Sequence, residues 1–386
     1  MSEIMRWNPM KKLFKMKTKR LFSLALTFAL TASLAACASP EEAKNAAQGA
    51  ANGAAASAAS SSGSSAGTKI SVPKDAPWKS RDNKPVTVRA GFAKGMTGIA
   101  NQFAIENGWY EDAGITIDEL DIPNPVSAFG AGEVDIADGD PGTYIPAIVN
   151  KVPIRIVSNM WRSKGAYWII AKPEIKTWAD LKGKKFGTAQ ATGGMKMTSL
   201  EVLTKNGVDI NKDIEQVANG FYQTGYATLT SGNVDATIIH QPYATIAKKA
   251  GYTVLGKTWE YMPAYNTGVL VATDKMLSEQ PDVVKRVLEV YYYANDYAKN
   301  HLDEFLPWAS KYLNIDQDVA REAIESEIEL WENDPVVQPD RLQKTEDLLK
   351  EYGMQKQAYP VDNVYDNKIA DEVARKLKLG KYASGN

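Results

Sequence analysis

The stretch Gly132-Glu133-Val134-Asp135-Ile136-Ala137 recurs in altered form as Gly232-Asn233-Val234-Asp235-Ala236-Thr237. Each stretch predicts a short buried strand, because apolar and β-branched residues follow a glycine turn. Each also ends a unit of the same order: a strand, a glycine-containing corner, a helix and this last strand. The units run from Val86 to Asp140 and from Lys185 to His240. Strands that alternate with helices are typical of α/β folds with mostly parallel sheets, so we expect two α/β lobes.

The same reading extends over the rest of the chain. Strands are expected at residues 86–90, 115–120, 134–137, 153–158, 166–171, 185–188, 235–239, 252–256 and 267–272. A helix is expected at residues 99–106, where Asn107-Gly108 supplies a C-terminal cap. After Pro281 the chain is expected to be mainly helical. An apolar stripe at helical spacing indicates core packing there, and it consists of Val284, Val287, Leu288 and Tyr291.

Composition limits the classes of function. The 386 residues include 45 Lys and Arg and 46 Asp and Glu, for a net charge of -1, so no basic face for nucleic acid is expected. The single cysteine, Cys37, leaves no disulfide and no thiolate metal site in the fold. The acidic residues and the two histidines show no metal-ligand spacing, and no Walker loop or nucleophile elbow is present. We expect neither a cofactor nor a metal.

The N-terminal residues have the pattern of an export signal. Lysines and an arginine precede an apolar run from Leu21 to Leu30, which is too short to span a membrane. Leu34-Ala35-Ala36-Cys37 then resembles the bacterial lipobox, which implies that residues 1–36 are removed and that Cys37 is acylated. Residues 37–80, rich in Ala, Ser and Gly, are expected to form a flexible tether. Met10 and Met16 are alternative starts for the signal.

Several stretches together resemble the solute-binding proteins of ABC importers in the nitrate, sulfonate and taurine group. They are Asn107-Gly108-Trp109-Tyr110-Glu111-Asp112-Ala113-Gly114-Ile115, the 132–137 stretch, Trp178-Ala179-Asp180-Leu181-Lys182-Gly183-Lys184-Lys185-Phe186-Gly187 and Leu229-Thr230-Ser231-Gly232-Asn233-Val234-Asp235-Ala236. Each stretch alone is a weak signal, whereas their order along the chain is specific.

The resemblance implies a two-lobed periplasmic-binding-protein-like fold of type II, with a ligand cleft between the lobes. Lobe 1 would comprise residues 81–176 and 263–386, and lobe 2 residues 177–262. The hinges would lie at residues 172–177 and 260–266. We expect a monomer that is exported and anchored by lipid, either at the outer face of the cell membrane or on the periplasmic side of the envelope. Its expected partners are a small solute, an ABC permease and, through Cys37, the membrane itself.

Parallel α/β lobes bind ligands beyond the carboxyl ends of their strands. Four loops are selected by this rule: Gly95–Gly98, with Met96 and Thr97; Asp138–Thr143; Ala191–Lys196; and His240–Tyr243. Thr192-Gly193-Gly194 at a helix start suits an anion, because free backbone N–H groups point there, and Lys196 adds a charge. The alternative is an ordinary turn followed by a solvated lysine.

The remaining candidates also have two interpretations. Asp138 and Asp140 end a strand, so either can accept from an amine or hydroxyl of a solute, or Asp140 can cap the next helix. Trp161 and Tyr243 follow strand ends and can wall the cleft, or they can belong to the core. His240 and Gln241 can hydrogen-bond a solute oxygen, and a lone histidine does not make a metal site.

Three functions fit these features. The first is a lipid-anchored receptor that captures a small anionic or zwitterionic solute, resembling sulfonate, taurine or nitrate, and delivers it to the permease. The second keeps the fold and binds a thiamine-precursor pyrimidine or another flat aromatic solute. The third is an enzyme similar to a pyrimidine synthase. We expect no enzyme, because such relatives use a cysteine-rich cluster and the one cysteine here belongs to the signal.

Overall fold

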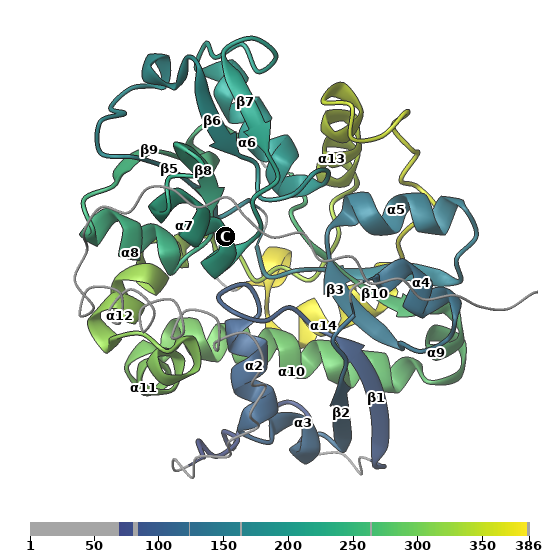
Figure 1. Cartoon of the computed structure of the whole chain (residues 1–386). Coiled ribbons are helices and arrows are strands. Elements are labelled where there is room, and N and C mark those ends of the chain that lie inside the picture. Colours follow the sequence, from purple (N-terminus) through teal and green to yellow (C-terminus); the bar gives the residue numbers. More distant parts are fainter. Residues whose placement is uncertain (1–68, 80–83, 123, 163, 263–264, 384–386) are drawn as a thin grey trace, which may run out of the picture. The chain divides into compact units, whose positions relative to one another are not determined.

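The computed structural model describes residues 69–79, 84–122, 124–162, 164–262 and 265–383 (Figure 1). All of them lie in the compact unit Gly67–Asn386. The predicted signal segment, Cys37 and most of the predicted tether lie outside the described residues. Two five-stranded sheets organise the unit, as expected from the repeated stretches.

The first sheet has the strand order β2-β1-β3-β10-β4. Its strands are β1 (Val86–Gly91), β2 (Ile115–Glu119), β3 (Ile136–Gly139), β4 (Ile154–Asn159) and β10 (Val269–Thr273). The strands β2, β1 and β3 are parallel, whereas β10 runs antiparallel to both β3 and β4.

The second sheet has the same layout, with the order β7-β6-β8-β5-β9. Its strands are β5 (Trp168–Ala171), β6 (Lys184–Gly187), β7 (Ile214–Val217), β8 (Ala236–Ile239) and β9 (Thr253–Lys257). Here β7, β6 and β8 are parallel and β5 is the antiparallel strand between β8 and β9. We call the parts built on the first and second sheets lobe 1 and lobe 2.

The antiparallel strands correct one expected lobe boundary. Residues up to 176 were expected in lobe 1, but β5 pairs with β8 and β9 and therefore belongs to lobe 2. The chain crosses between β4 and β5, not at residues 172–177, and it returns between η2 (Thr258–Glu260) and β10. The expected boundary is wrong because pairing between strands distant in sequence decides sheet membership, and no local pattern records it.

The repeated aspartate has the same role in both lobes. The Asp135 Oδ2 atom accepts from the Arg89 backbone N–H at 2.9 Å, and the Asp235 Oδ2 atom accepts from the Lys185 N–H at 2.9 Å. The backbone N–H groups of Asp135 and Asp235 donate in return to the Arg89 and Lys185 carbonyls. Each aspartate thus joins the last strand of its unit to the first.

Helices surround both sheets. Lobe 2 contains η1 (Trp178–Leu181), α6 (Gly194–Lys205), α7 (Tyr222–Thr230), α8 (Tyr243–Lys249) and η2. Lobe 1 contains α2 (Ile99–Glu106), α3 (Trp109–Asp112), α4 (Pro125–Gly130), α5 (Pro141–Val149), α9 (Asp274–Glu279), α10 (Pro281–Asn300), α11 (Leu302–Leu313), α12 (Gln317–Glu325), η3 (Ile328–Leu330), α13 (Pro339–Glu351), α14 (Lys368–Leu377) and η4 (Gly380–Tyr382). The predicted apolar stripe of α10 is fully buried.

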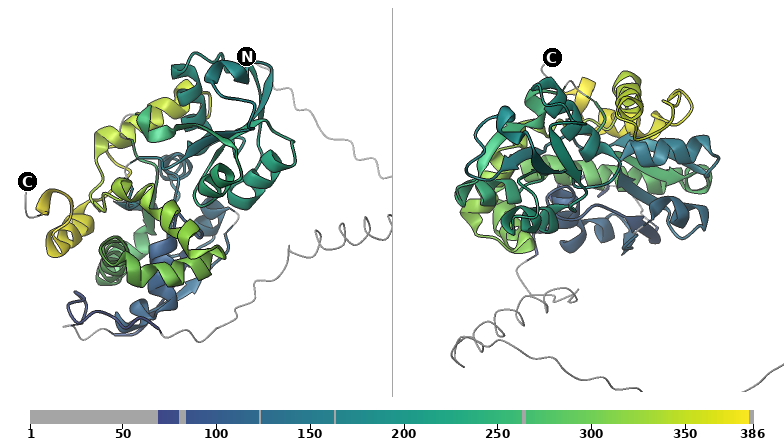
Figure 2. Two further views of the ribbon diagram at one scale, coloured as in Figure 1. Left: turned by 90° about the vertical axis from the view of Figure 1, so that its left-hand side faces the viewer. Right: turned by 45° about the horizontal axis from the view of Figure 1, so that its top comes forward.

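Helix α13 contacts both lobes. It packs on α5 of lobe 1 and on α6 of lobe 2, and in the left view of Figure 2 it lies beside lobe 2. Leu348 and Leu349 join the apolar core of lobe 2. Beyond the helix, the Tyr352 hydroxyl donates to the Glu201 Oε2 atom at 2.6 Å. The C-terminal part of the chain therefore holds the lobes together on this side.

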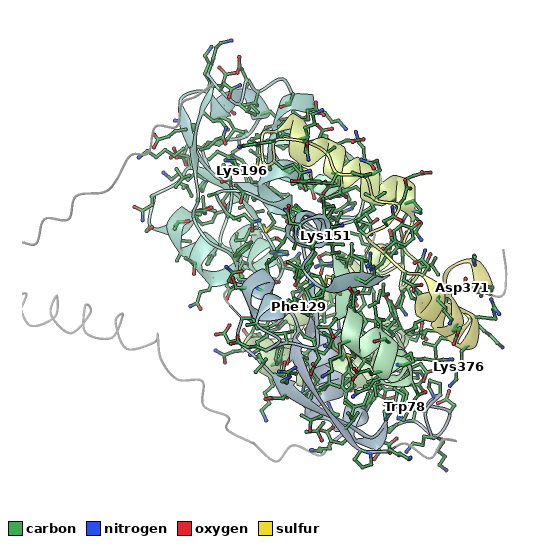
Figure 3. All side chains as sticks on the ribbon, turned by 90° about the vertical axis from the view of Figure 1, so that its right-hand side faces the viewer. Trp78, Phe129, Lys151, Lys196, Asp371 and Lys376 are labelled. Atoms are coloured by element: carbon green, nitrogen blue, oxygen red, sulfur yellow. The ribbon has the colours of Figure 1, made fainter. Side chains whose placement is uncertain are left out.

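Residues 69–79 correct the expected end of the tether. Trp78 is fully buried, and its Nε1 donates to the Asp112 Oδ2 atom at 2.8 Å. The Ile70 N–H donates to the Asn107 Oδ1 atom at 2.8 Å, and Lys376 of α14 donates to the Pro77 carbonyl at 2.8 Å (Figure 3). The buried tryptophan and these hydrogen bonds attach the segment to the rest of the first lobe, so the segment belongs to lobe 1.

Candidate functional site

The loops at the carboxyl ends of the two sheets contact each other. Asp140 directly follows β3 of lobe 1, and its Oδ2 atom accepts from the N–H of Gly194, the first residue of α6 in lobe 2, at 2.7 Å. Thr97 follows β1, and its hydroxyl lies 2.6 Å from the hydroxyl of Tyr222, the first residue of α7. The loops of Thr97, Asp140 and Gly194 are among those in which the sequence predicts a ligand site, whereas the loop before Tyr222 is not.

Asp140 both caps a helix and crosses the lobe boundary. Its Oδ1 atom accepts from the Gly142 N–H at 2.9 Å, which is the helix cap considered from the sequence. Its Oδ2 atom occupies the start of α6, where a solute anion was expected. Burial raises the pKa of Asp140, although these two N–H groups act in the opposite direction. The helix start therefore receives a carboxylate from within the chain.

The flanking residues of this loop have different positions. Gly193 has φ 102° and lies at the contact between Asp140 and α6. A Cβ atom at this position would be only 3.0 Å from the Asp140 Oδ2 atom and 2.0 Å from the Gln190 Nε2 atom. Thr192 is exposed, and the Lys196 ammonium donates to the Ala191 carbonyl at 3.1 Å (Figure 3). In the described part of the chain neither side chain bonds to lobe 1, which fits the ordinary interpretation of both.

Asp138 is buried next to the same boundary. Its side chain is 8% exposed, and its Oδ1 atom accepts from the Ala93 N–H at 2.8 Å. Its Oδ2 atom has no hydrogen-bond partner among the described residues. Burial raises the pKa of Asp138 to about 7. The side chain thus has a free acceptor inside the protein.

Arg162 is a site residue that the sequence analysis missed. Its guanidinium is 6% exposed, lies 4.4 Å from the centre of the Trp161 ring and donates to the Thr97 hydroxyl at 3.2 Å. The Trp161 Nε1 atom donates to the Thr97 carbonyl at 3.0 Å. Trp161 and Met96 are themselves buried in the core of lobe 1. Trp161 therefore contacts both Thr97 and Arg162 from the core of lobe 1, and Met96 belongs to the same core.

Glu327, just beyond α12, was also missed. It is 1% exposed, its nearest cation is the Arg162 Nη1 atom at 3.9 Å, and neither of its oxygens has a hydrogen-bond partner among the described residues. Burial raises the pKa of Glu327 to about 7, against the effect of Arg162. Only the fold brings a residue so late in the sequence to the lobe boundary.

Three rings of lobe 2 lie at this boundary. The His240 ring lies 4.7 Å from the Tyr222 ring at 19° and 4.9 Å from the Tyr167 ring at 81°. Burial and the charge of Arg162 lower the pKa of His240 to about 3, so the imidazole is neutral. Tyr222 has φ 46°, a strained conformation for a tyrosine, which is typical of functional sites. No local sequence signal marks Tyr222.

The last two predicted residues contribute differently. The Gln241 Nε2 atom donates to the Ser326 hydroxyl at 2.8 Å, and its Oε1 atom accepts from the Thr245 N–H at 3.0 Å. Gln241 therefore ties lobe 2 to the end of α12. The Tyr243 ring lies 5.7 Å from the Tyr226 ring, among the apolar residues of lobe 2.

A groove of about 890 Å³ lies elsewhere on the boundary, with Trp168, Lys248, Arg321 and Glu322 in its lining. Lys248 and Lys249 make ion pairs with Glu322 across it, at 3.1 and 3.0 Å. Its lining includes none of Asp138, Asp140, Arg162 and His240. In the described part of the chain, no cluster of three or more acidic, histidine or cysteine residues could hold a metal, and no helix could span a membrane.

A comparison with known protein families identifies the family of the chain. Residues 99–305, more than half of the chain, match the family described as NMT1/THI5 like. The chain belongs to the NMT1/THI5-like family. The matched region includes Asp138, Asp140, Arg162, Gly194 and His240, and it ends before Glu327.

Two relatives of this NMT1/THI5-like chain carry names that refer to binding. A Brucella abortus protein, provisionally named a binding protein, is 28% identical over 244 residues, which are 61% of this chain and 74% of that protein. A Bacillus subtilis protein, provisionally named for binding aliphatic sulfonates, is 25% identical over 318 residues, which are 79% of this chain and 92% of that protein.

Solved structures confirm the expected fold. The alkanesulfonate-binding protein SsuA of Xanthomonas axonopodis pv. citri, bound to MOPS, is 17% identical with a TM-score of 0.59, and the match covers 74% of this chain and 99% of that one. SsuA of Escherichia coli is 20% identical with a TM-score of 0.59, covering 74% and 93%. The desulfurization enzyme DSZB is 15% identical with a TM-score of 0.59, covering 75% and 99%. The fold of this family member thus occurs in both binding proteins and an enzyme.

Proposed function

We propose that the chain is the extracytoplasmic solute-binding component of an ABC importer, with a small anionic or zwitterionic solute of the sulfonate class. The observation that carries the proposal is the Asp140–Gly194 contact at 2.7 Å, in which the start of α6 holds an anionic group at the boundary of two lobes. The names of the Bacillus subtilis relative and of both SsuA proteins support the solute class.

The solute would replace Asp140 at the start of α6. Its acid group would accept from the Gly194 N–H, where the positive end of the helix dipole favours negative charge. Arg162, with one hydrogen bond to Thr97, has further N–H donors for the same group. The connections β4–β5 and η2–β10 would act as the hinges of lobe closure.

The export signal supports the rest of the proposal. Acylation of Cys37 would hold the protein at the outer face of the membrane, next to the permease that receives the solute. More than one acyl chain is needed for stable anchoring, since a single chain binds only weakly.

A ligand screen by thermal unfolding of the purified full-length protein tests this function. Taurine, alkanesulfonates, nitrate, bicarbonate and a thiamine-type aminopyrimidine are the compounds. A ligand at 100 times its dissociation constant stabilises by about 2.7 kcal/mol, which is measurable. We expect stabilisation by a sulfonate. A screen in which none of the anions or zwitterions stabilises the protein would contradict the proposal.

A flat aromatic solute is the second candidate, and the rings of Tyr167, Tyr222 and His240 favour it. Stacking on such rings is worth about 0.5–1.5 kcal/mol per pair. Stabilisation by the aminopyrimidine alone in the same screen would select it. Recovery of the bound compound unchanged, measured by NMR after incubation, would distinguish either receptor from an enzyme.

A further inference from the structure

Two buried carboxylates at the lobe boundary have acceptor atoms without partners. The Asp138 Oδ2 atom and both oxygens of Glu327 make no hydrogen bond among the described residues, although the side chains are 8% and 1% exposed. Buried polar atoms are nearly always paired, and an unpaired acceptor costs about 1–3 kcal/mol. Such atoms inside a ligand-binding fold indicate a place for a donor from outside the chain.

Arg162 does not supply these donors. Its Nη1 atom is 3.9 Å from Glu327 Oε1, beyond hydrogen-bond distance, and its Nη2 atom donates to the Thr97 hydroxyl. No other basic side chain forms an ion pair with Asp138 or Glu327 in the described residues. Both acids therefore lack a full counter-charge.

The two carboxylates come from distant parts of the chain and are linked to one loop. Asp138 lies near the end of β3 and accepts from the Ala93 N–H, whereas Glu327 follows α12 and lies 3.9 Å from Arg162. Arg162 donates to the Thr97 hydroxyl, which in turn lies 2.6 Å from the Tyr222 hydroxyl. Ala93 and Thr97 belong to the same loop after β1. The arrangement contains one guanidinium and two acids whose acceptor atoms lack hydrogen bonds among the described residues.

This chemistry suits a cation with N–H donors. A protonated amine or amidine gives two or more charge-assisted hydrogen bonds to carboxylates. A simple anion would add a like charge to two acids in a buried place, which is unfavourable.

We propose that Asp138 and Glu327 bind a positively charged nitrogen group of the solute, an ammonium or an amidinium, so that the solute is a zwitterion or an organic cation and not a simple anion. This inference rests on the proposed function, because it assigns a substrate class to the same site. Arg162 and the start of α6 then contact the acid end of a zwitterion.

Matched pairs of compounds test the inference with the full-length protein by titration calorimetry. Taurine and ethanesulfonate share the acid and differ in the amine, as do β-alanine and propionate; the aminopyrimidine and its hydroxy analogue form a third pair. We expect the nitrogen-bearing member of at least one pair to bind tenfold or more tightly than its partner. Equal binding within every pair that binds would overturn the inference and leave the receptor function standing. Absence of binding in all three pairs would overturn the inference, and if nitrate and bicarbonate also fail to stabilise the protein in the unfolding screen, the receptor function falls as well.

Substitutions test whether Glu327 and Asp138 are the residues that recognise the nitrogen group. Glu327→Gln keeps the size of the side chain and removes its charge, so we expect a loss of tenfold or more for the nitrogen-bearing compound and little change for its partner. Asp138→Asn, which keeps the acceptor for Ala93, should act in the same direction. Glu329→Gln, at an exposed position nearby, is the control. Equal losses for both members of a pair would show that Asp138 and Glu327 do not recognise the nitrogen group and would overturn the inference.

Discussion

The Asp140 carboxylate of lobe 1 accepts a 2.7 Å hydrogen bond from the backbone N–H of Gly194 in lobe 2. The bond joins the end of β3 to the start of α6, so one side chain connects the lobes at the predicted anion position. Asp140 also caps α5 through Gly142, which fixes its direction. The chain thus contains an internal competitor for any acid group that binds there.

Asp140→Asn should keep the α5 cap and weaken the contact with Gly194. A charge-assisted hydrogen bond contributes about 1.5–3 kcal/mol, so weakening it should let the lobes separate more easily. We therefore expect a larger radius of gyration without solute. The affinity for an anionic or zwitterionic ligand should be unchanged or higher, because the competing carboxylate is removed. Small-angle scattering and calorimetry measure the two effects. Asp121→Asn, at an exposed position, is the control. A marked loss of affinity would mean that Asp140 contacts the solute directly.

Gly193→Ala should destabilise the protein more than Gly183→Ala. Both glycines have positive φ, 102° and 74°, but a Cβ at Gly183 meets no atom within 4 Å, whereas one at Gly193 meets Gln190 and Asp140. The difference isolates the effect of the contact from that of the backbone, and we expect about 1–3 kcal/mol in urea unfolding. Equal destabilisation would show that the lobes adjust to the added methyl group.

Glu327 should make the stability of the ligand-free protein depend on pH. Burial raises its pKa to about 7 from 4.5, so the folded state binds more protons than the unfolded state between these values. The free energy of unfolding therefore falls as pH rises through this window and levels off above it. Asp138 acts in the same direction, whereas neutral His240, whose pKa is lowered to about 3, acts in the opposite direction below pH 6.5.

Comparing the wild type with Glu327→Gln at each pH cancels the effects that Asp138, Asp140 and His240 have on both proteins. We expect this difference in unfolding free energy to shift against the wild type between about pH 5 and pH 8, measured by urea unfolding. A difference that stays constant with pH would place the pKa of Glu327 near its ordinary value.

Trp78→Ala should destabilise the folded unit by about 3–5 kcal/mol, the usual cost of removing a buried tryptophan side chain. Thermal unfolding measures this loss, with the exposed Lys74→Ala as the control. A change within 0.5 kcal/mol, the range of ordinary surface substitutions, would return residues 69–79 to the tether.

Cys37→Ser should release the protein from its membrane anchor. Cell fractionation with immunodetection compares the variant with the wild type, which we expect in the membrane fraction. If both proteins remain in the membrane fraction to the same extent, acylation of Cys37 is not the anchor.

The local elements were predictable to within a few residues. The helix expected at residues 99–106 is α2, Ile99–Glu106, and the stripe from Val284 to Tyr291 is buried as expected. Strand β7 (Ile214–Val217) and helix α7 (Tyr222–Thr230) were not predicted, and their residues are only partly apolar. Asp140 and His240 were found because each follows a strand, and Asp138 because it lies near the end of one; these positions are visible in the sequence.

The sequence alone determined the two-lobed α/β fold, because hydrophobic periodicity and glycine turns act over a few residues and repeat in both halves. Tertiary structure decided the exchange of β5 into lobe 2, the occupation of the α6 start by Asp140 and the contacts that link Glu327 to Arg162 and, through Thr97, to Tyr222. These features depend on contacts between residues far apart in the chain. The contacts that stabilise these features form only when the sheets and helices pack together, so no short stretch of sequence predicts them.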